Sequence, residues 1–299
     1  MTDPQEQPVI SLRQVVKRFG HQTVLDGINL DIKRGETMVI MGGSGSGKST
    51  TLRLMIGSFL PEEGQIEFFG EDTCGYDETQ FNKIRRRFGI LFQSGALFNS
   101  MTVAENVALP MREHTDLDPA IIDITVKIKL ELVNLREHAD KYPAQLSGGM
   151  KKRAGLARAM ALDPEILFYD EPSAGLDPVT SAQIDKLILN LSNQLGVTSV
   201  VVTHEMDSAF TIADRMAMLD KGRILKVETR QWFEQLRDLP EPEAEKLDED
   251  HRLIRQFLRG DPEGPITDRH SDLGYEEDLF GSAASFPTVV PSLESTRGG

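Results

Sequence analysis

The sequence predicts an α/β fold built around a parallel sheet, and three stretches of the chain carry this prediction. Residues 37–41 form a compact apolar strand that runs into a glycine-rich loop, after which residues 51–56 have helical character and Gly57 ends them. Strand-like runs return at residues 166–169 and 197–203, each followed by polar residues and then a helical pattern. Strands that alternate with helices in this way are typical of a parallel sheet.

Two further regions complete the predicted organisation. Apolar and polar positions alternate through residues 9–41, with Gly20 and Gly35 as interruptions, which predicts short strands. Residues 102–161 are rich in helical patterns, broken at Pro143 and at Gly148-Gly149, and we interpret them as a helical insertion.

Composition limits the classes of function that fit this chain of 299 residues. No stretch approaches the ~18–20 consecutive apolar residues that cross a bilayer, and the N-terminus lacks the pattern of a secretion signal. The single cysteine, Cys74, excludes an intrachain disulfide and a cysteine-cluster metal site. We therefore expect a cytoplasmic globular protein.

The net charge of −14 argues against a protein that binds nucleic acid by neutralising phosphates. Most of this charge lies near the C-terminus, because residues 238–299 contain 15 acidic and 6 basic side chains. Within that acidic region, residues 253–254 and 257–258 predict one apolar helix face that ends before Gly260. We expect one docking helix in a flexible tail, and a disordered amphipathic stretch is the alternative.

The glycine-rich loop has the pattern of a phosphate-binding loop. Its candidate binding residues are Gly42, Gly43, Ser44, Gly45, Ser46, Gly47, Lys48, Ser49 and Thr50. Glycines let backbone N–H groups wrap phosphates at a helix N-terminus. Lys48 would reach the β and γ phosphates and Ser49 would ligate Mg²⁺. A flexible linker is the alternative, and the strand before the loop and the helix after it argue against a linker.

Two carboxylates, Asp170 and Glu171, follow the apolar strand at residues 166–169. We expect Asp170 to support Mg²⁺ through water and Glu171 to polarise the attacking water as general base. Acidic residues after a strand are commonly helix caps, so this motif does not decide the function by itself.

The run Leu146-Ser147-Gly148-Gly149-Met150 lies upstream of those carboxylates, and with the phosphate loop it closely resembles the ATP-binding cassette (ABC) family of transport ATPases. The resemblance implies that Ser147, Gly148 and Gly149 open a helix whose N-terminus binds the γ-phosphate of a nucleotide held by a second copy. Other members of the family have glutamine more often at position 150. The phosphate contacts do not use that side chain.

The remaining motifs of the family occur in order. The resemblance implies that Phe19 stacks on adenine, Gln93 links Mg²⁺ and water to the helical insertion, Asp177 belongs to the loop that meets the other subunit, and His204 contacts the γ-phosphate. Without the other motifs, a phenylalanine such as Phe19 is more often a core residue, and a histidine such as His204 more often has a structural role. Phe19 and Ser173 stand where tyrosine and threonine are frequent, and neither change removes a catalytic group.

The resemblance implies a P-loop (RecA-like) core with an antiparallel β subdomain and an inserted helical subdomain. We expect an ATPase domain at 9–239 with the helical part at about 94–161, an extension at 240–266 and an acidic tail at 267–299. ATP and Mg²⁺ are the expected cofactors. The expected functional unit is a homodimer that closes around two ATP molecules.

Residues 93–110, 147–158 and 256–265 are similar to the subfamily that energises Mce-associated phospholipid transport. This similarity implies a membrane permease, an Mce-domain protein and a small STAS-type partner, with the chain peripheral on the inner membrane through the permease. An importer ATPase for amino acids or another small polar solute remains the alternative. Soluble cassette ATPases that act on ribosomes or DNA usually carry two cassettes or a long coiled coil, and neither is visible here. P-loop GTPases fit poorly, because residues 82–85 lack the aspartate of a guanine-reading motif.

Overall fold

The structure is a computed structural model that describes residues 7–267, and the chain divides into two compact units. The first unit extends to Lys246 and the second begins at Leu247. The predicted acidic tail lies outside the described residues except for Thr267.

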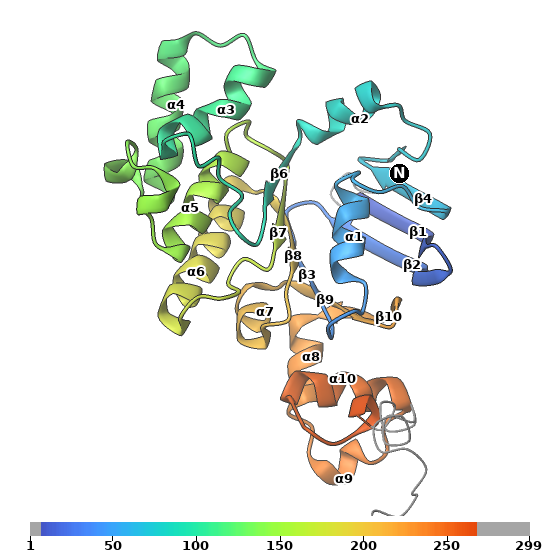
Figure 1. Cartoon of the computed structure of the whole chain (residues 1–299). Helices are drawn as coiled ribbons and strands as arrows, with labels where there is room; N and C mark the ends of the chain where they lie inside the picture. Colours follow the sequence, from blue (N-terminus) through green and yellow to red (C-terminus); the bar gives the residue numbers. More distant parts are fainter. Residues whose placement is uncertain (1–6, 268–299) are drawn as a thin grey trace, which may run out of the picture. The chain divides into compact units, whose positions relative to one another are not determined.

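A six-stranded sheet forms the centre of the first unit, and Figure 1 shows its strands side by side. The strand order is β10 (Arg223–Thr229), β9 (Arg215–Asp220), β3 (Thr37–Met41), β8 (Thr198–Val202), β7 (Ile166–Asp170) and β6 (Phe88–Leu91). All neighbouring strands are parallel except β10, which is antiparallel to β9. The apolar runs at β3, β7 and β8 are buried along their length, as parallel strands covered on both faces require. The predicted α/β fold is confirmed.

A second, antiparallel sheet has the order β2 (Gln22–Lys33), β1 (Pro8–Phe19), β4 (Glu63–Phe68) and β5 (Glu71–Asp72). The prediction of short strands at residues 9–41 was wrong in length, because β1 and β2 have 12 residues each. Register shifts interrupt β1 between Leu12 and Val15, where Gln14 has a φ of 48°. These irregularities break the alternation from which strand length was judged.

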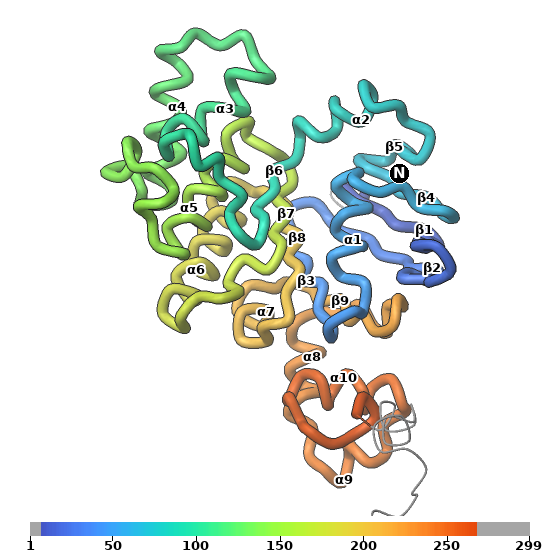
Figure 2. The backbone as a smooth tube through the Cα atoms, in the orientation of Figure 1, coloured from blue at the N-terminus to red at the C-terminus, as the bar shows by residue number. Residues whose placement is uncertain are grey.

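Helices of the first unit cover its central sheet and form the predicted insertion. The first unit contains α1 (Lys48–Met55), α2 (Glu78–Arg85), α3 (Val103–His114), α4 (Pro119–Leu132), α5 (Gly148–Ala159), α6 (Pro178–Leu195), α7 (Met206–Ile212), α8 (Arg230–Arg237) and α9 (Glu241–Ala244), and the second unit contains α10 (Glu249–Arg259). Short 3-10 turns lie at Arg136–His138 and Pro143–Gln145. Figure 2 shows the backbone leaving β6, passing through α3, α4 and α5, and returning to β7. The helical insertion is therefore confirmed.

Aromatic packing joins the two sheets of the first unit. Phe68 on β4 lies 5.0 Å from Phe88 on β6, measured between ring centroids, and Phe88 lies 5.3 Å from Phe168 on β7. All three rings are buried in one apolar cluster with residues of β1, β2 and α1. This shared core therefore joins the antiparallel sheet to the central sheet.

The second unit is organised around α10, which ends at Arg259, in the region where the sequence predicts a helix that ends before Gly260. Leu253, Ile254 and Leu258 are buried on one face, and Gly260 closes the helix in the left-handed region with a φ of 67°. The Gln256 amide accepts a hydrogen bond from the Ile266 N–H at 2.7 Å. No helix within residues 7–267 is long and apolar enough to span a membrane.

Candidate nucleotide-binding and catalytic site

Four parallel strands end at the same edge of the central sheet, and the candidate residues follow those ends. Ile40 of β3 and Asp170 of β7 both pair with Val202 of β8, while Leu91 of β6 pairs with Tyr169 of β7. This one edge of the sheet therefore carries the glycine loop, the two carboxylates, His204 and Gln93. In open α/β sheets this carboxyl edge is where ligands bind.

The glycine loop between β3 and α1 is packed too closely for side chains at two of its glycines. A Cβ on Gly42 would lie 2.1 Å from the carbonyl oxygen of Leu219, and one on Gly47 would lie 2.5 Å from the Leu25 side chain. Gly47 precedes α1 with a φ of 108°. The Ser46 hydroxyl oxygen is buried and has no hydrogen-bond partner among the described residues. A buried unpaired hydroxyl in a loop at a helix N-terminus fits a phosphate ligand.

Lys48 is the cation of this loop and only 8% of it is exposed. Its Nζ donates to the carbonyl oxygens of Gly42 at 2.7 Å and Gly43 at 2.9 Å. Burial lowers the pKa of Lys48, and the negative charge of Glu171 opposes that shift. Lys48 therefore ties the loop together and brings a positive charge beside the carboxylates.

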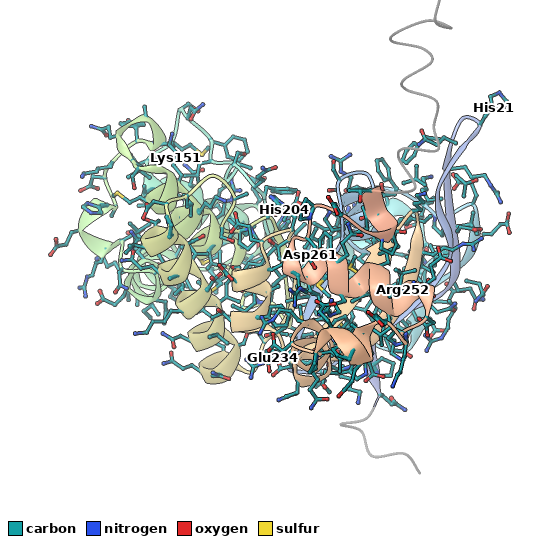
Figure 3. The ribbon with its side chains drawn as sticks, turned by 90° about the horizontal axis from the view of Figure 1, so that it is seen from below. His21, Lys151, His204, Glu234, Arg252 and Asp261 are labelled. Atoms are coloured by element: carbon teal, nitrogen blue, oxygen red, sulfur yellow. The ribbon has the colours of Figure 1, made fainter. Side chains whose placement is uncertain are left out.

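Glu171 and His204 face each other across the edge of the sheet. The Glu171 Oε1 lies 2.9 Å from the His204 Nδ1, and the Glu171 backbone N–H donates to the carbonyl oxygen of Val202 at 2.9 Å. Glu171 has a φ of 49°, a strained value of the kind that is concentrated at functional sites. The Glu171 side chain is 13% exposed and that of His204 is 59% exposed. His204 is labelled in Figure 3.

The candidate metal ligands lie on three separate segments. Asp170 ends β7, Ser49 is exposed in the first turn of α1, and Gln93 is exposed two residues beyond β6. Burial and the neighbouring charge of Glu171 raise the pKa of Asp170, and Arg53 opposes them. Residues 7–267 contain no group of three or more His, Cys, Asp or Glu side chains able to hold a metal. The arrangement fits Mg²⁺, which keeps several waters and binds through few protein oxygens and substrate phosphates.

The base-stacking candidate, Phe19, ends β1 with 45% of its surface exposed. Its ring meets Phe59 edge-on at 5.3 Å between centroids, and the Lys17 Nζ lies 5.3 Å from the Phe19 centroid. His21, two residues further on, is at the far tip of the β1–β2 hairpin (Figure 3). Phe19 is thus a supported aromatic surface and not a core residue.

The serine-glycine turn and the Asp177 loop are neighbours within this chain. Ser147 caps α5 by accepting from the Met150 N–H at 3.3 Å. Asp177 caps α6 by accepting from the N–H groups of Val179 and Thr180, and hydrogen bonding to Thr180 lowers the pKa of Asp177. A Cβ on Gly149 would lie 2.4 Å from the Thr180 Cγ2. The exposed N-terminus of α5 is therefore held against the start of α6.

Replacing Gly149 with alanine is expected to lower the free energy of unfolding by about 1–3 kcal/mol, because the added methyl group overlaps Thr180. The double variant Gly149→Ala/Thr180→Ser removes the obstructing Cγ2 and keeps the hydroxyl, so it should regain most of this loss. Denaturant unfolding of the two variants and of Thr180→Ser measures the difference. Equal stability of the single and double variants would contradict the contact.

One residue of the site was not predicted from the sequence. Lys152 on α5 is buried and donates from Nζ to the carbonyl oxygens of Glu171 at 3.0 Å and Ala174 at 2.8 Å. Burial lowers the pKa of Lys152, and the charges of Glu205 and Glu171 oppose that shift. Lys152 therefore fixes the backbone of the loop that carries the Glu171 carboxylate.

Replacing Lys152 with methionine is expected to lower kcat for ATP about 10-fold and to leave the KM nearly unchanged, because two loop carbonyls lose a charged donor. Steady-state hydrolysis checks this expectation. Lys151→Met is the matched control, since Lys151 is the adjacent residue on the same helix (Figure 3) and is not among the residues that hold the loop. Equal rates for the two variants would refute the role of Lys152.

A glycine loop between a strand and a helix, with two acidic residues at a neighbouring strand end, defines a P-loop nucleotide-binding protein. The family described as "ABC transporter" matches residues 25–174. The chain belongs to the ABC transporter family and is one of its ATPases.

Relatives with assigned names align over most of the chain. The chain is 41% identical over 272 residues to the intermembrane phospholipid transport system ATP-binding protein MlaF of Escherichia coli, covering 91% of this chain and 96% of that protein. It is 40% identical over 257 residues to the probable ribonucleotide transport ATP-binding protein mkl of Mycobacterium leprae. That alignment covers 86% of this chain and 70% of the mkl protein. Among solved structures, the dimeric post-hydrolysis state of the ATP-binding cassette MJ0796 bound to ADP and Pi has 34% sequence identity to this chain and a TM-score of 0.68. The superposition covers 74% of this chain and 98% of the MJ0796 chain.

Proposed function

We propose that this chain supplies the ATP hydrolysis that drives phospholipid transport through a membrane permease and an Mce-domain protein. The observation that carries the hydrolytic part is the pair of Glu171 and His204, joined at 2.9 Å beside the phosphate loop. The cargo rests on the 41% identity to MlaF across nearly the whole of both chains. The chain would lie on the inner membrane through the permease.

The nucleotide would extend from Phe19 to the glycine loop. Phe19 offers an exposed aromatic face for adenine, and stacking of this kind carries little base specificity. The backbone N–H groups of residues 42–50, the unpaired Ser46 hydroxyl and the Lys48 ammonium would bind the phosphates. Ser49, Gln93 and Asp170 would hold Mg²⁺, directly or through water, which neutralises charge on the phosphates when bound.

Hydrolysis needs a base for the attacking water and a group that holds this base. The Glu171 carboxylate is the base that accepts a proton from the water, and its small exposed fraction limits competition from solvent. His204 fixes the carboxylate through its Nδ1 and leaves its Nε2 to face the γ-phosphate. Lys152 holds the backbone of the loop that carries Glu171, because its Nζ donates to the carbonyl oxygens of Glu171 and Ala174.

The serine-glycine turn is proposed to act on the nucleotide of a second copy. Ser147, Gly148 and Gly149 open α5 at the positive end of the helix, which favours an anion, and Ser147 and Gly148 are exposed there. Asp177 caps α6 beside them, so its loop and the α5 N-terminus would meet the second copy together. The dimeric state of MJ0796 supports this arrangement.

A cavity of about 390 Å³ is the proposed contact with the permease. It is lined by residues of β6, α2, α3 and α5, including Pro110 and His114, and by Phe92 directly after β6. Arg158, which also lines it, donates to the carbonyl oxygens of Gly95 and Ala96 in the segment after Gln93. A permease helix in this cavity would therefore be linked to the Gln93 segment and so to the nucleotide site.

Affinity purification of the tagged chain from its native membrane in mild detergent tests this function. Recovery of a multi-span permease with an Mce-domain protein, a small STAS-type protein and bound phospholipid is the expected result. A permease without these partners would keep the ATPase and change its cargo. Recovery of ribosomal or DNA-repair proteins would contradict a role in transport.

Transport of a small polar solute is the second candidate, because the mkl relative is named for ribonucleotide transport and is 40% identical to this chain. Stimulation of ATP hydrolysis in the purified assembly distinguishes the two. Phospholipid should stimulate it under the first proposal, whereas a ribonucleotide or an amino acid should do so under the second.

A further inference from the structure

Three buried polar side chains behind the catalytic pair form a continuous hydrogen-bonded chain. Ser173, Ser208 and Asp185 are 0%, 4% and 5% exposed. The Ser208 hydroxyl donates to the Asp185 Oδ1, and the Ser173 and Ser208 hydroxyl oxygens lie 3.2 Å apart. The Ser208 hydroxyl has one proton and donates it to Asp185, so the Ser173 hydroxyl must be the donor in its bond to Ser208. We refer to these three residues as the Asp185 link.

The Asp185 link joins the two loops that carry the catalytic pair. Ser173 is two residues beyond Glu171, and Ser208 is four residues beyond His204 in the first half of α7. Asp185 is on α6, the helix that Asp177 caps. The loops are therefore connected twice, once at the surface by Glu171 and His204 and once in the interior by the Asp185 link.

A buried carboxylate is a costly way to hold two loops. Burial raises the pKa of Asp185, the Ser208 hydroxyl opposes this shift, and the nearby charge of Glu205 adds to it. Apolar side chains of similar volume usually stabilise an interior at least as well as buried charge does. What they do not provide is a directional bond that fixes one arrangement of the loops.

We propose that Asp185, Ser208 and Ser173 are positioning residues that keep Glu171 and His204 in register for ATP hydrolysis. The proposal rests on the function assigned to Glu171 and His204 above. None of the three residues is among those that would bind the nucleotide. Loss of the link should therefore affect the rate of hydrolysis and leave nucleotide binding unchanged.

The first test is steady-state hydrolysis by the full chain in the assembly with which it purifies. Ser208→Ala and Ser173→Ala are expected to lower kcat by about 10- to 100-fold, with little change in the KM for ATP, as a small misplacement of catalytic groups does. Ser208→Thr keeps the hydroxyl at a position that lines a cavity of about 490 Å³. It should retain the wild-type kcat.

Ser199→Ala is the matched control. Ser199 is fully buried, and its hydroxyl pairs with that of Ser192 on α6 at 2.9 Å, so the change removes a buried hydroxyl bond to the same helix, although one without a carboxylate acceptor. The Ser199–Ser192 bond connects neither of the loops that carry Glu171 and His204. A kcat reduced as much in Ser199→Ala as in Ser208→Ala would overturn the proposal, since any buried serine would then have the same effect.

A double variant separates positioning from stability. Ser208→Ala leaves the Asp185 carboxylate without its hydroxyl donor, so its melting temperature should fall below that of Ser199→Ala. Ser208→Ala/Asp185→Ala removes the buried charge and should recover melting temperature but not kcat. Recovery of kcat together with melting temperature would show that the link acts only on stability.

Hydrogen exchange gives a readout that does not depend on hydrolysis. In Ser208→Ala, the amides of residues 171–177 and 203–209 should exchange faster than in the wild type, whereas Ser199→Ala should leave both segments protected. Unchanged exchange in both segments would overturn the proposal even if the protein hydrolyses ATP. A wild type without hydrolysis would refute the proposed function, and the exchange rates would still decide whether the link positions the loops.

Discussion

Replacing Glu171 with glutamine is expected to lower ATP turnover by about 10²- to 10⁴-fold, the contribution usual for a general base. The amide cannot accept a proton from water, but it has nearly the same shape and can still hydrogen bond to the His204 Nδ1. The phosphate loop is untouched, so ATP affinity should stay close to that of the wild type. Steady-state hydrolysis and equilibrium nucleotide binding measure the two effects.

Asp207→Asn is the control for this variant. It removes a carboxylate from the exposed start of α7, three residues from His204, and should leave turnover close to the wild-type rate. Turnover by Glu171→Gln at the control rate would refute Glu171 as the base. Loss of nucleotide binding in Glu171→Gln would place this residue in the binding site.

Replacing Lys48 with methionine is expected to weaken ATP binding by about 10- to 100-fold, because a bond from a charged donor contributes ~1.5–3 kcal/mol. Lys48 also holds the carbonyl oxygens of Gly42 and Gly43, so the loop itself should become less ordered. Titration with a fluorescent ATP analogue measures the affinity.

Lys83→Met, at an exposed position in α2, is the control for charge and should bind ATP as the wild type does. Thermal unfolding of Lys48→Met shows whether the fold is retained. Wild-type affinity in a folded Lys48→Met protein would mean that the phosphates lie elsewhere.

Local patterns were enough to predict the parts of the fold that carry the phosphate loop. The strand at residues 37–41 coincides with β3, and the helix after the loop is α1, because a buried apolar run and a glycine loop each have a strong local signature. No secondary structure was predicted for residues 61–92, although they contain β4, β5, α2 and β6. These strands are short, and their pairing with distant partners decides their structure.

The sequence predicted strands before the candidate site residues, but not the contacts of those residues with one another. The structure pairs Glu171 with His204, 33 residues away, a contact that no pattern in the sequence predicts. Lys152 reaches carbonyls 19 and 22 residues away, and Asp185 meets Ser208 across 23 residues. Such contacts depend on how α5, α6 and α7 pack, and no spacing in the sequence signals them. The docking role of α10 and the flexible acidic tail at 267–299 stay predictions.

Transfer of a fluorescent phospholipid by the purified assembly in proteoliposomes tests the central claim most directly. ATP should drive transfer in the wild type, and the Glu171→Gln assembly should retain ATP binding and lose both hydrolysis and transfer. Hydrolysis that proceeds in the wild type without moving phospholipid, and that a polar solute stimulates instead, would contradict the account.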